Sequence, residues 1–153
     1  MQLTTYTDYA LRTLIYLVPR PGETVSTREI ADHYGISLNH LVKVAKFLTN
    51  EGWLISTRGI GGGISLAPHT VAAKVGDIVR CTENTDLVEC FHLPTNTCPI
   101  HRACRLKPIL LQARQAFFEV LDSYSVRDLA RSAGELKALR PPPGKQPDVR
   151  VNR

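Results

Sequence analysis

The stretch "STREIADHYGISLNHLVKVAKFLTNEGWLISTRGIGGGISLAP" (residues 26–68) decides the fold, because it sets two short helices and a hairpin in direct succession. Its first segment opens with Ser26 and Glu29, which have the S-x-x-E spacing of a capping box at a helix N-terminus. Gly35 is a natural C-cap, because glycine adopts the left-handed conformation without strain. We therefore expect a helix over residues 26–35.

A third helix is expected over residues 37–52, with Ser37 as its cap. Its inward positions recur at helical spacing. These positions are Leu38, Leu41, Ala45 and Leu48. Two short capped helices separated by a tight turn with a glycine indicate a helix-turn-helix.

The end of the stretch, residues 53–68, predicts a β-hairpin whose tip is "RGIGGG". The residues expected to alternate along its two arms are Trp53, Ile55 and Thr57, and then Ile64 and Leu66. A helix-turn-helix followed by a hairpin is a winged helix-turn-helix. The fold class is therefore mainly α with a small β-hairpin wing.

Outside this stretch, a first helix is expected over residues 7–18, and "PRPG" ends it. Its apolar stripe is Tyr6, Tyr9, Ala10, Leu14 and Leu17. A short helix is expected over residues 75–82. Residues 83–103 show no helical or strand period.

A long helix follows from about Arg105, because Pro108 is tolerated only in a first turn. Its apolar residues step by four and three, as in a coiled-coil seam. They are Leu106, Leu110, Ala113, Phe117, Val120 and Tyr124. Leu111 and Phe118 add a second apolar face, which favours burial against a second copy of the chain.

These patterns divide the chain into four parts. A weaker final helix is expected over residues 125–139, and the tail carries four prolines and four basic residues against one acid, which is typical of disorder. The parts are a winged helix-turn-helix (1–80), a cysteine loop (81–104), a dimerisation helix with a C-terminal helix (105–139) and a disordered basic tail (140–153).

The basic composition suits a polyanionic partner, although the same charge is common in proteins that have no such partner. The 153 residues carry a net charge of +5 and are 43% hydrophobic, which is ordinary for a globular chain. The N-terminus lacks a signal-peptide layout, and no run is long enough for a membrane span. We therefore expect a cytoplasmic protein with no membrane partner, in which cysteines stay reduced.

The outward residues of the third helix are suited to reading DNA in the major groove. Asn39 can pair with adenine, Lys43 can reach guanine or phosphate, and Lys46 is placed for phosphate. Arg58 at the wing can enter the minor groove, although a solvated Arg58 on a flexible glycine turn is the alternative. The predicted DNA-binding residues are Ser37, Asn39, His40, Lys43, Lys46, Arg58, Gly61 and Gly62.

Three cysteines lie within "CFHLPTNTCPIHRAC" (residues 90–104), with gaps of seven and five residues. Cys90, Cys98 and Cys104 are too widely spaced for zinc knuckles, but they suit an iron–sulfur cluster. Redox thiols or packing remain alternatives. No C-x-x-C motif or Ser/His/Asp arrangement stands out, so no enzyme is expected.

The other candidate ligands have simpler interpretations. Cys81 is expected to be a buried free cysteine of the short helix, near Ile78. His92 and His101 are expected to be solvated loop residues. From the sequence alone, Asp8 is a helix-start residue that the helix dipole favours.

Five segments resemble the small iron–sulfur winged-helix regulators, the family that includes the NsrR, IscR and RirA types. They are "MQLTTYTDYALRTLIYL", "GISLNHLVKVAKFL", "RGIGGGISL", "VGDIVR" and the cysteine loop running into "CRLKPIL". The resemblance covers about residues 1–130. The first segment and "NHLVKV" look most like the nitric-oxide-sensing repressors of the NsrR type.

The resemblance implies a homodimer joined through the long helix, with Cys90, Cys98 and Cys104 as cluster ligands. In the NsrR type a fourth ligand is an N-terminal aspartate of the other subunit, and Asp8 has that place. In the IscR type a histidine stands three positions after the third cysteine. Lys107 occupies that position here, which argues against IscR.

The resemblance therefore predicts a transcriptional repressor that binds a palindromic operator and is gated by a cluster that senses nitric oxide. The cofactor would be a 4Fe-4S cluster, with 2Fe-2S as the other possibility. The alternatives are an iron-responsive regulator of the RirA type, a regulator that reports cluster status, and a constitutive DNA-binding protein stabilised by zinc.

Overall fold

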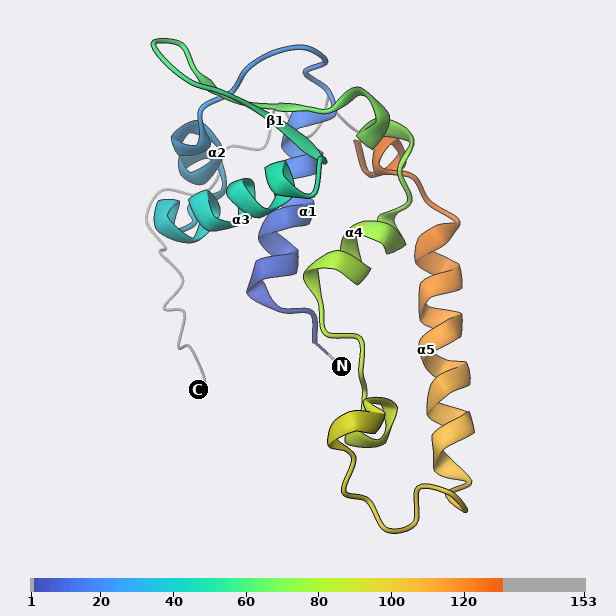
Figure 1. The fold of residues 1–153 in the computed structure, drawn as a ribbon. Coiled ribbons are helices and arrows are strands. Elements are labelled where there is room, and N and C mark those ends of the chain that lie inside the picture. The colour runs from blue at the N-terminus through green and yellow to red at the C-terminus, as the bar shows by residue number, and fades with distance from the viewer. Residues whose placement is uncertain (1, 131–153) are drawn as a thin grey trace.

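The computed structural model of the protein describes residues 2–130 (Figure 1). Five α-helices and one two-stranded antiparallel sheet make up its regular structure over this range. The elements are α1 (Thr5–Leu17), α2 (Thr27–Tyr34), α3 (Leu38–Asn50), β1 (Leu54–Thr57), β2 (Gly63–Leu66), α4 (Val75–Thr82) and α5 (Leu106–Asp122). The mainly helical class with a hairpin wing is confirmed.

Helices α2 and α3 form the expected helix-turn-helix, and local chemistry explains their ends. The Ser26 hydroxyl accepts a hydrogen bond from the Glu29 N–H at 3.1 Å, and Gly35 closes α2 in the left-handed conformation with φ 62°. Half of the expected capping box is wrong, because the Glu29 carboxylate accepts from the Tyr16 hydroxyl at 2.9 Å. That contact ties α2 to α1.

The hairpin pairs Leu54 with Leu66 and Thr57 with Gly63. On β2 the expected alternation is confirmed, since Ile64 and Leu66 are buried. On β1 the expected phase is wrong. Leu54 faces the core, whereas the Ile55 side chain is 49% exposed. The strand enters from α3 through a bond from the Trp53 N–H to the Leu48 carbonyl at 2.8 Å, which sets this phase.

A single apolar core holds the N-terminal half together. Helices α1, α2 and α3 each contribute one face, the hairpin covers one side, and α4 adds Ile78. The fully buried large apolar side chains are Leu14, Leu17, Ile30, Leu41, Leu48, Ile78, Val44, Val79 and Val126. The predicted stripe of α1 is therefore its core face.

The long helix α5 leaves this core. It begins at Leu106 with Pro108 in its first turn, as expected, and it runs beside α4 and away from α2 and α3 (Figure 1). The cysteine segment lies at the end of α5 that is remote from the hairpin, with short 3-10 turns at Glu89–Phe91 and Leu93–Thr95.

After α5 the chain turns back to the core through a 3-10 helix, Val126–Ala130. The rest of the expected C-terminal helix, residues 131–139, and the expected basic tail, 140–153, lie outside the described residues. Within the described range, no helix is long and apolar enough to cross a membrane.

Candidate functional site

The outward face of α3 presents the side chains expected to read DNA. Because Leu41 and Leu48 fix the opposite face in the core, Asn39, Lys43 and Lys46 are exposed. His40 is half-buried beside them. The structure therefore places these four predicted residues on one accessible surface.

Ser37 stands at the N-cap of α3, but its side chain makes no capping hydrogen bond. It differs in this from Ser26, whose hydroxyl caps α2 at 3.1 Å. The expected cap is therefore positional only. The Ser37 side chain is exposed at the end of α3 that would enter a groove first.

The wing glycines are required by the turn itself. Gly59 and Gly61 have φ of 102° and 77°, a region that disfavours side chains. A Cβ at Gly62 would overlap the Thr57 carbonyl. The turn requires these glycines whether or not the wing binds DNA, and it leaves Arg58 exposed at the tip.

Sequence reasoning missed the side chain at the centre of the tip. Ile60 is fully exposed, and it stands between glycines that give it no apolar neighbour along the chain. The sequence signal for Ile60 was an apolar residue with a glycine on either side of it.

The charge of α3 and the wing also favours DNA binding, because Glu51 is the one acid from Ser37 to Leu66, against Lys43, Lys46 and Arg58.

The four cysteines are free thiols. Cys90 is buried, with 8% exposed, and Cys98 and Cys104 are half-buried. Over residues 2–130 the structure gathers no group of three or more Cys, His, Asp and Glu that could hold a metal ion. The single chain thus supplies the donors on one loop but does not bring them together.

The donor set fits an iron–sulfur cluster in its chemistry. Three unpaired thiols lie on a segment without long regular structure, which can adjust around a cluster. Cys81 is different, because burial raises the pKa of its thiol and its sulfur donates to the Ile78 carbonyl. It is half-buried on α4, so the expectation of full burial is too strong.

The loop histidines are held locally. His92 Nδ1 lies 2.9 Å from the Thr95 hydroxyl, and His101 Nδ1 lies 3.0 Å from the Cys98 carbonyl. The loop is attached to α5 by Arg114, which lies 3.4 Å from Asp86 and places its guanidinium over the Phe91 ring at 4.8 Å.

The Asp8 carboxylate is paired with Arg12 on the same helix. Arg12 Nε donates to Oδ1 at 3.0 Å, and Nη2 lies 3.0 Å from Oδ2. The Asp8 side chain is 45% exposed, so it is reachable from outside the chain. Sequence reasoning missed Arg12, although the i, i+4 spacing of opposite charges was a usable signal.

Helix α5 carries an apolar surface that nothing in the described chain covers. None of its residues is buried, and Ile109 and Val120 are 59% and 60% exposed. A mostly apolar cavity of about 170 Å³ opens beside it, lined in part by Leu3, Leu87 and Phe117. Exposed apolar residues gathered on one helix are typical of an interaction site.

The family model for Rrf2, described as iron-dependent transcriptional regulators, matches residues 3–132. The chain belongs to the Rrf2 family. A curated relative from Shouchella clausii (strain KSM-K16), the HTH-type transcriptional regulator NsrR, is 45% identical over 141 residues. The match covers 91% of this chain and 95% of that relative.

Solved structures of Rrf2-type regulators share the fold. IscR from T. potens matches with a TM-score of 0.68 at 26% identity, covering 92% of this chain and 94% of that one. CymR from Staphylococcus aureus matches with a TM-score of 0.65 at 27% identity, covering 84% and 97%. This Rrf2 protein is therefore a winged-helix transcription regulator, as the sequence predicted.

Proposed function

We propose that this Rrf2 protein is a cytoplasmic, dimeric transcriptional repressor whose DNA affinity is gated by an iron–sulfur cluster that senses nitric oxide. One observation carries the proposal. Three free thiols lie on the segment that joins α4 to the long helix α5, whose apolar face is uncovered. The described residues before that segment, 2–82, with α1 to α4 and the hairpin, are the DNA-reading half. The likeness to the regulator named NsrR supports nitric oxide as the signal.

DNA binding rests on α3 and the wing. Asn39 and Lys43 face outward for base edges, Lys46 for phosphate, and Arg58 for the minor groove. Ser37, with its side chain outside the cap, adds a donor at the helix N-terminus. His40, Gly61 and Gly62 complete the proposed surface, the glycines by allowing close approach of the wing backbone.

The dimer rests on α5 and the adjacent apolar cavity. Leu106, Ile109 and Val120 on α5, and Tyr124 just after its end, are each more than half exposed. A second copy of the same helix has the matching apolar surface, so a two-fold pairing buries both. A two-fold dimer suits a palindromic operator, whose half-sites repeat the symmetry of the protein.

Cys90, Cys98 and Cys104 would hold the cluster. The loop was expected over residues 81–104, but residues 81 and 82 end α4, so residues 83–104 would be the loop. When bound, the cluster supplies iron that reacts with nitric oxide. A 4Fe-4S cluster leaves one iron for a ligand outside the three cysteines, and Asp8 of the other subunit is our proposed donor. Asp8 would have to give up its two contacts with Arg12 to serve there.

The test uses matched cysteine variants. Cys98→Ser should abolish the visible absorption and the iron and sulfide content of protein purified without oxygen. Cys81→Ser is the control, because this thiol lies on α4 outside the loop, and it should leave both unchanged. A Cys98→Ser protein that keeps its full iron and sulfide content would contradict the ligand assignment.

Asp8 has a separate test. Asp8→Ala should change the cluster's absorption and lower its stability to oxygen, while Asp32→Ala, an exposed acid on α2, should not. An unchanged spectrum in Asp8→Ala would return Asp8 to its helix-start role. Zinc without iron in the purified protein would favour the constitutive zinc-stabilised DNA binder. A response to iron depletion but not to nitric oxide would favour the RirA type.

A further inference from the structure

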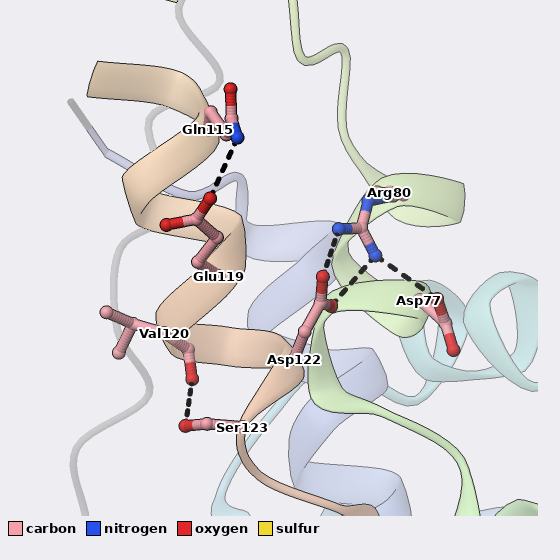
Figure 2. Close-up of polar contacts among 7 residues, drawn as sticks. All are labelled: Asp77, Arg80, Gln115, Glu119, Val120, Asp122 and Ser123. Atoms are coloured by element: carbon pink, nitrogen blue, oxygen red, sulfur yellow. Dashed lines mark hydrogen bonds and ion pairs between the residues drawn. The ribbon is translucent and has the colours of Figure 1, made fainter. Parts of the chain in front are cut away.

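The end of α5 is fixed to α4 by a forked ion pair (Figure 2). Arg80 Nη1 donates to Asp122 Oδ1 at 2.9 Å, and Nη2 donates to the other carboxylate oxygen, Oδ2. Asp77, one turn earlier on α4, lies 3.2 Å from the same guanidinium. The guanidinium also covers the Phe118 ring at 4.4 Å. Three side chains, Asp122, Asp77 and Phe118, therefore hold one arginine between the two helices.

Gly76 makes room for this pair. It is buried, and a Cβ at this position would overlap the Asp122 carboxylate. Gly76 is not among the glycines with positive φ, so the requirement is one of space and not of backbone conformation. The Asp122 carboxylate can therefore take this position against Arg80 because residue 76 has no side chain.

Backbone bonds beyond the ion pair complete the attachment. The Val75 N–H donates to the Tyr124 carbonyl at 3.0 Å, and the Val126 N–H donates to the Ala73 carbonyl at 2.9 Å. Val126 is fully buried in the same core as α1 and α3. The chain at the end of α5 is thus bound to the DNA-reading half on both sides of Tyr124.

The other end of α5 is remote from this attachment. Its 17 residues span about 25 Å at 1.5 Å per residue. The cysteine segment lies at that far end (Figure 1). Helix α4, in turn, packs on α1, which packs on α3. A tilt of α5 therefore reaches α3 through the contact with α4.

We propose that Gly76, Arg80 and Asp122 form a joint that fixes the angle between the long helix and the DNA-reading half, which makes Arg80 a positioning residue for operator binding. This inference rests on the proposed function of a dimer that pairs through α5. In such a dimer the joint sets how far apart the two α3 helices lie, and half-sites of an operator must be met at one fixed spacing.

The joint predicts that its variants lose affinity for one of two DNA probes and keep it for the other. One is a duplex that the wild-type, cluster-loaded protein selects from a randomised library, and the other is the same duplex with one half-site scrambled. Arg80→Gln and Gly76→Ala should each weaken binding to the two-half-site duplex about tenfold, because simultaneous engagement of both sites is lost when their geometry no longer fits. Affinity for the single half-site should stay within about twofold, since the surface of α3 is unchanged.

The two variants break the joint differently. Arg80→Gln removes the charge, whereas Gly76→Ala keeps every charge and displaces the Asp122 carboxylate. Glu119→Gln is the matched control, because Glu119 also lies on α5 but is bonded within that helix, to Gln115 at 2.8 Å (Figure 2). It should behave as wild type with both probes. A general loss of folding would instead lower affinity for the two probes alike.

The outcomes separate the joint from the proposed function. Wild-type protein that selects no duplex, or that binds both probes equally, contradicts the dimeric repressor itself. Wild-type protein that prefers two half-sites, with both variants keeping the same preference, overturns the joint. Where Arg80→Gln does not fold, Arg80→Lys replaces it. Lysine keeps the charge but loses the fork, and an unchanged preference there overturns the joint equally.

Discussion

The DNA-reading half and the long helix use apolar residues in opposite ways. Leu14 and Leu48 are fully buried in a core that α1, α2, α3 and the hairpin build together. Helix α5 is also rich in apolar residues, yet none of its residues is buried by the described chain. The first half buries its own apolar residues, whereas within the described residues those of α5 remain at least partly exposed.

The same difference holds for polar chemistry. In the DNA-reading half Ser26 caps a helix and Glu29 accepts from Tyr16, so local groups have local partners. In the second half three free thiols share a loop without forming a metal group in the described chain. The DNA-reading half therefore has its polar partners within the chain, whereas under the proposed function the thiols of the second half bind a cluster.

The largest effect on stability should follow from Leu14→Ala, which removes most of a buried side chain from the core. Leu14 is fully buried, so the variant should lose about 2–5 kcal/mol of unfolding free energy through lost transfer energy and a cavity. Urea denaturation measures this. Ile109→Ala on the uncovered face of α5 is the control and should cost far less in a monomer. Equal losses would show that α5 is covered within one chain.

Val120→Asp should prevent dimerisation through α5 without unfolding the DNA-reading half. An acid in the uncovered apolar face of α5 would oppose its own copy across a two-fold axis, so dimers should dissociate and DNA affinity should fall about a hundredfold. Sedimentation and DNA titration measure the two effects, and circular dichroism should stay unchanged. Gln112→Asp, an exposed polar position of the same helix, should keep the dimer. A dimeric Val120→Asp protein with full affinity would contradict this use of α5.

Sequence patterns predicted the elements well where the causes are local. Ser26, Gly35 and Pro108 mark helix ends through chemistry within one turn, and the structure places all three as expected. The phase of β1 could not be predicted, because the bond from Trp53 to Leu48 fixes which side Leu54 takes. This bond closes the end of α3 locally, so the turn from helix to strand decides the phase and the alternation along the strand does not.

The site was only partly predictable for a similar reason. The outward residues of α3 follow from its helical period, so Asn39 and Lys43 were within reach of sequence reasoning. The contact between Arg80 and Asp122 joins two helices that are far apart in the sequence, so no sequence spacing predicts it. The assembly of the cysteines depends on groups outside the single chain, which its own sequence pattern does not specify.

Two serines sharpen the comparison within the DNA-reading half. Ser26→Ala should cost about 1 kcal/mol of unfolding free energy, because its hydroxyl caps α2. Ser37→Ala should cost less stability, since its side chain makes no cap bond, and should weaken DNA binding instead. Thermal unfolding of both variants measures the loss of stability, and DNA titration measures the loss of affinity. Equal stability losses would mean that both serines serve as caps.

The smallest effect concerns His33, which lies against Tyr16 and Tyr34 with Arg20 and Glu29 nearby. Burial, and then the charge of Arg20, lowers the pKa of His33 below its ordinary 6.5. The unfolded chain therefore binds the proton first as pH falls. Stability contributed by neutral His33 should be lost as pH drops from 6.5 through the folded pKa.

An NMR titration of the His33 ring checks this directly. Arg20→Gln is the companion variant, and it should raise the His33 pKa by removing a positive charge, although burial still holds it down. A midpoint at or above 6.5 in the wild-type protein would contradict the burial of the neutral ring.

The central claim is that the state of the cluster controls DNA affinity. The most direct test measures both in one experiment. Cluster-loaded protein bound to its selected duplex is titrated with nitric oxide without oxygen, while absorption and DNA affinity are followed together. The account predicts that affinity falls about tenfold or more as the absorption changes, a coupling typical of linked sites. An affinity that stays constant while the absorption shows complete reaction would contradict it.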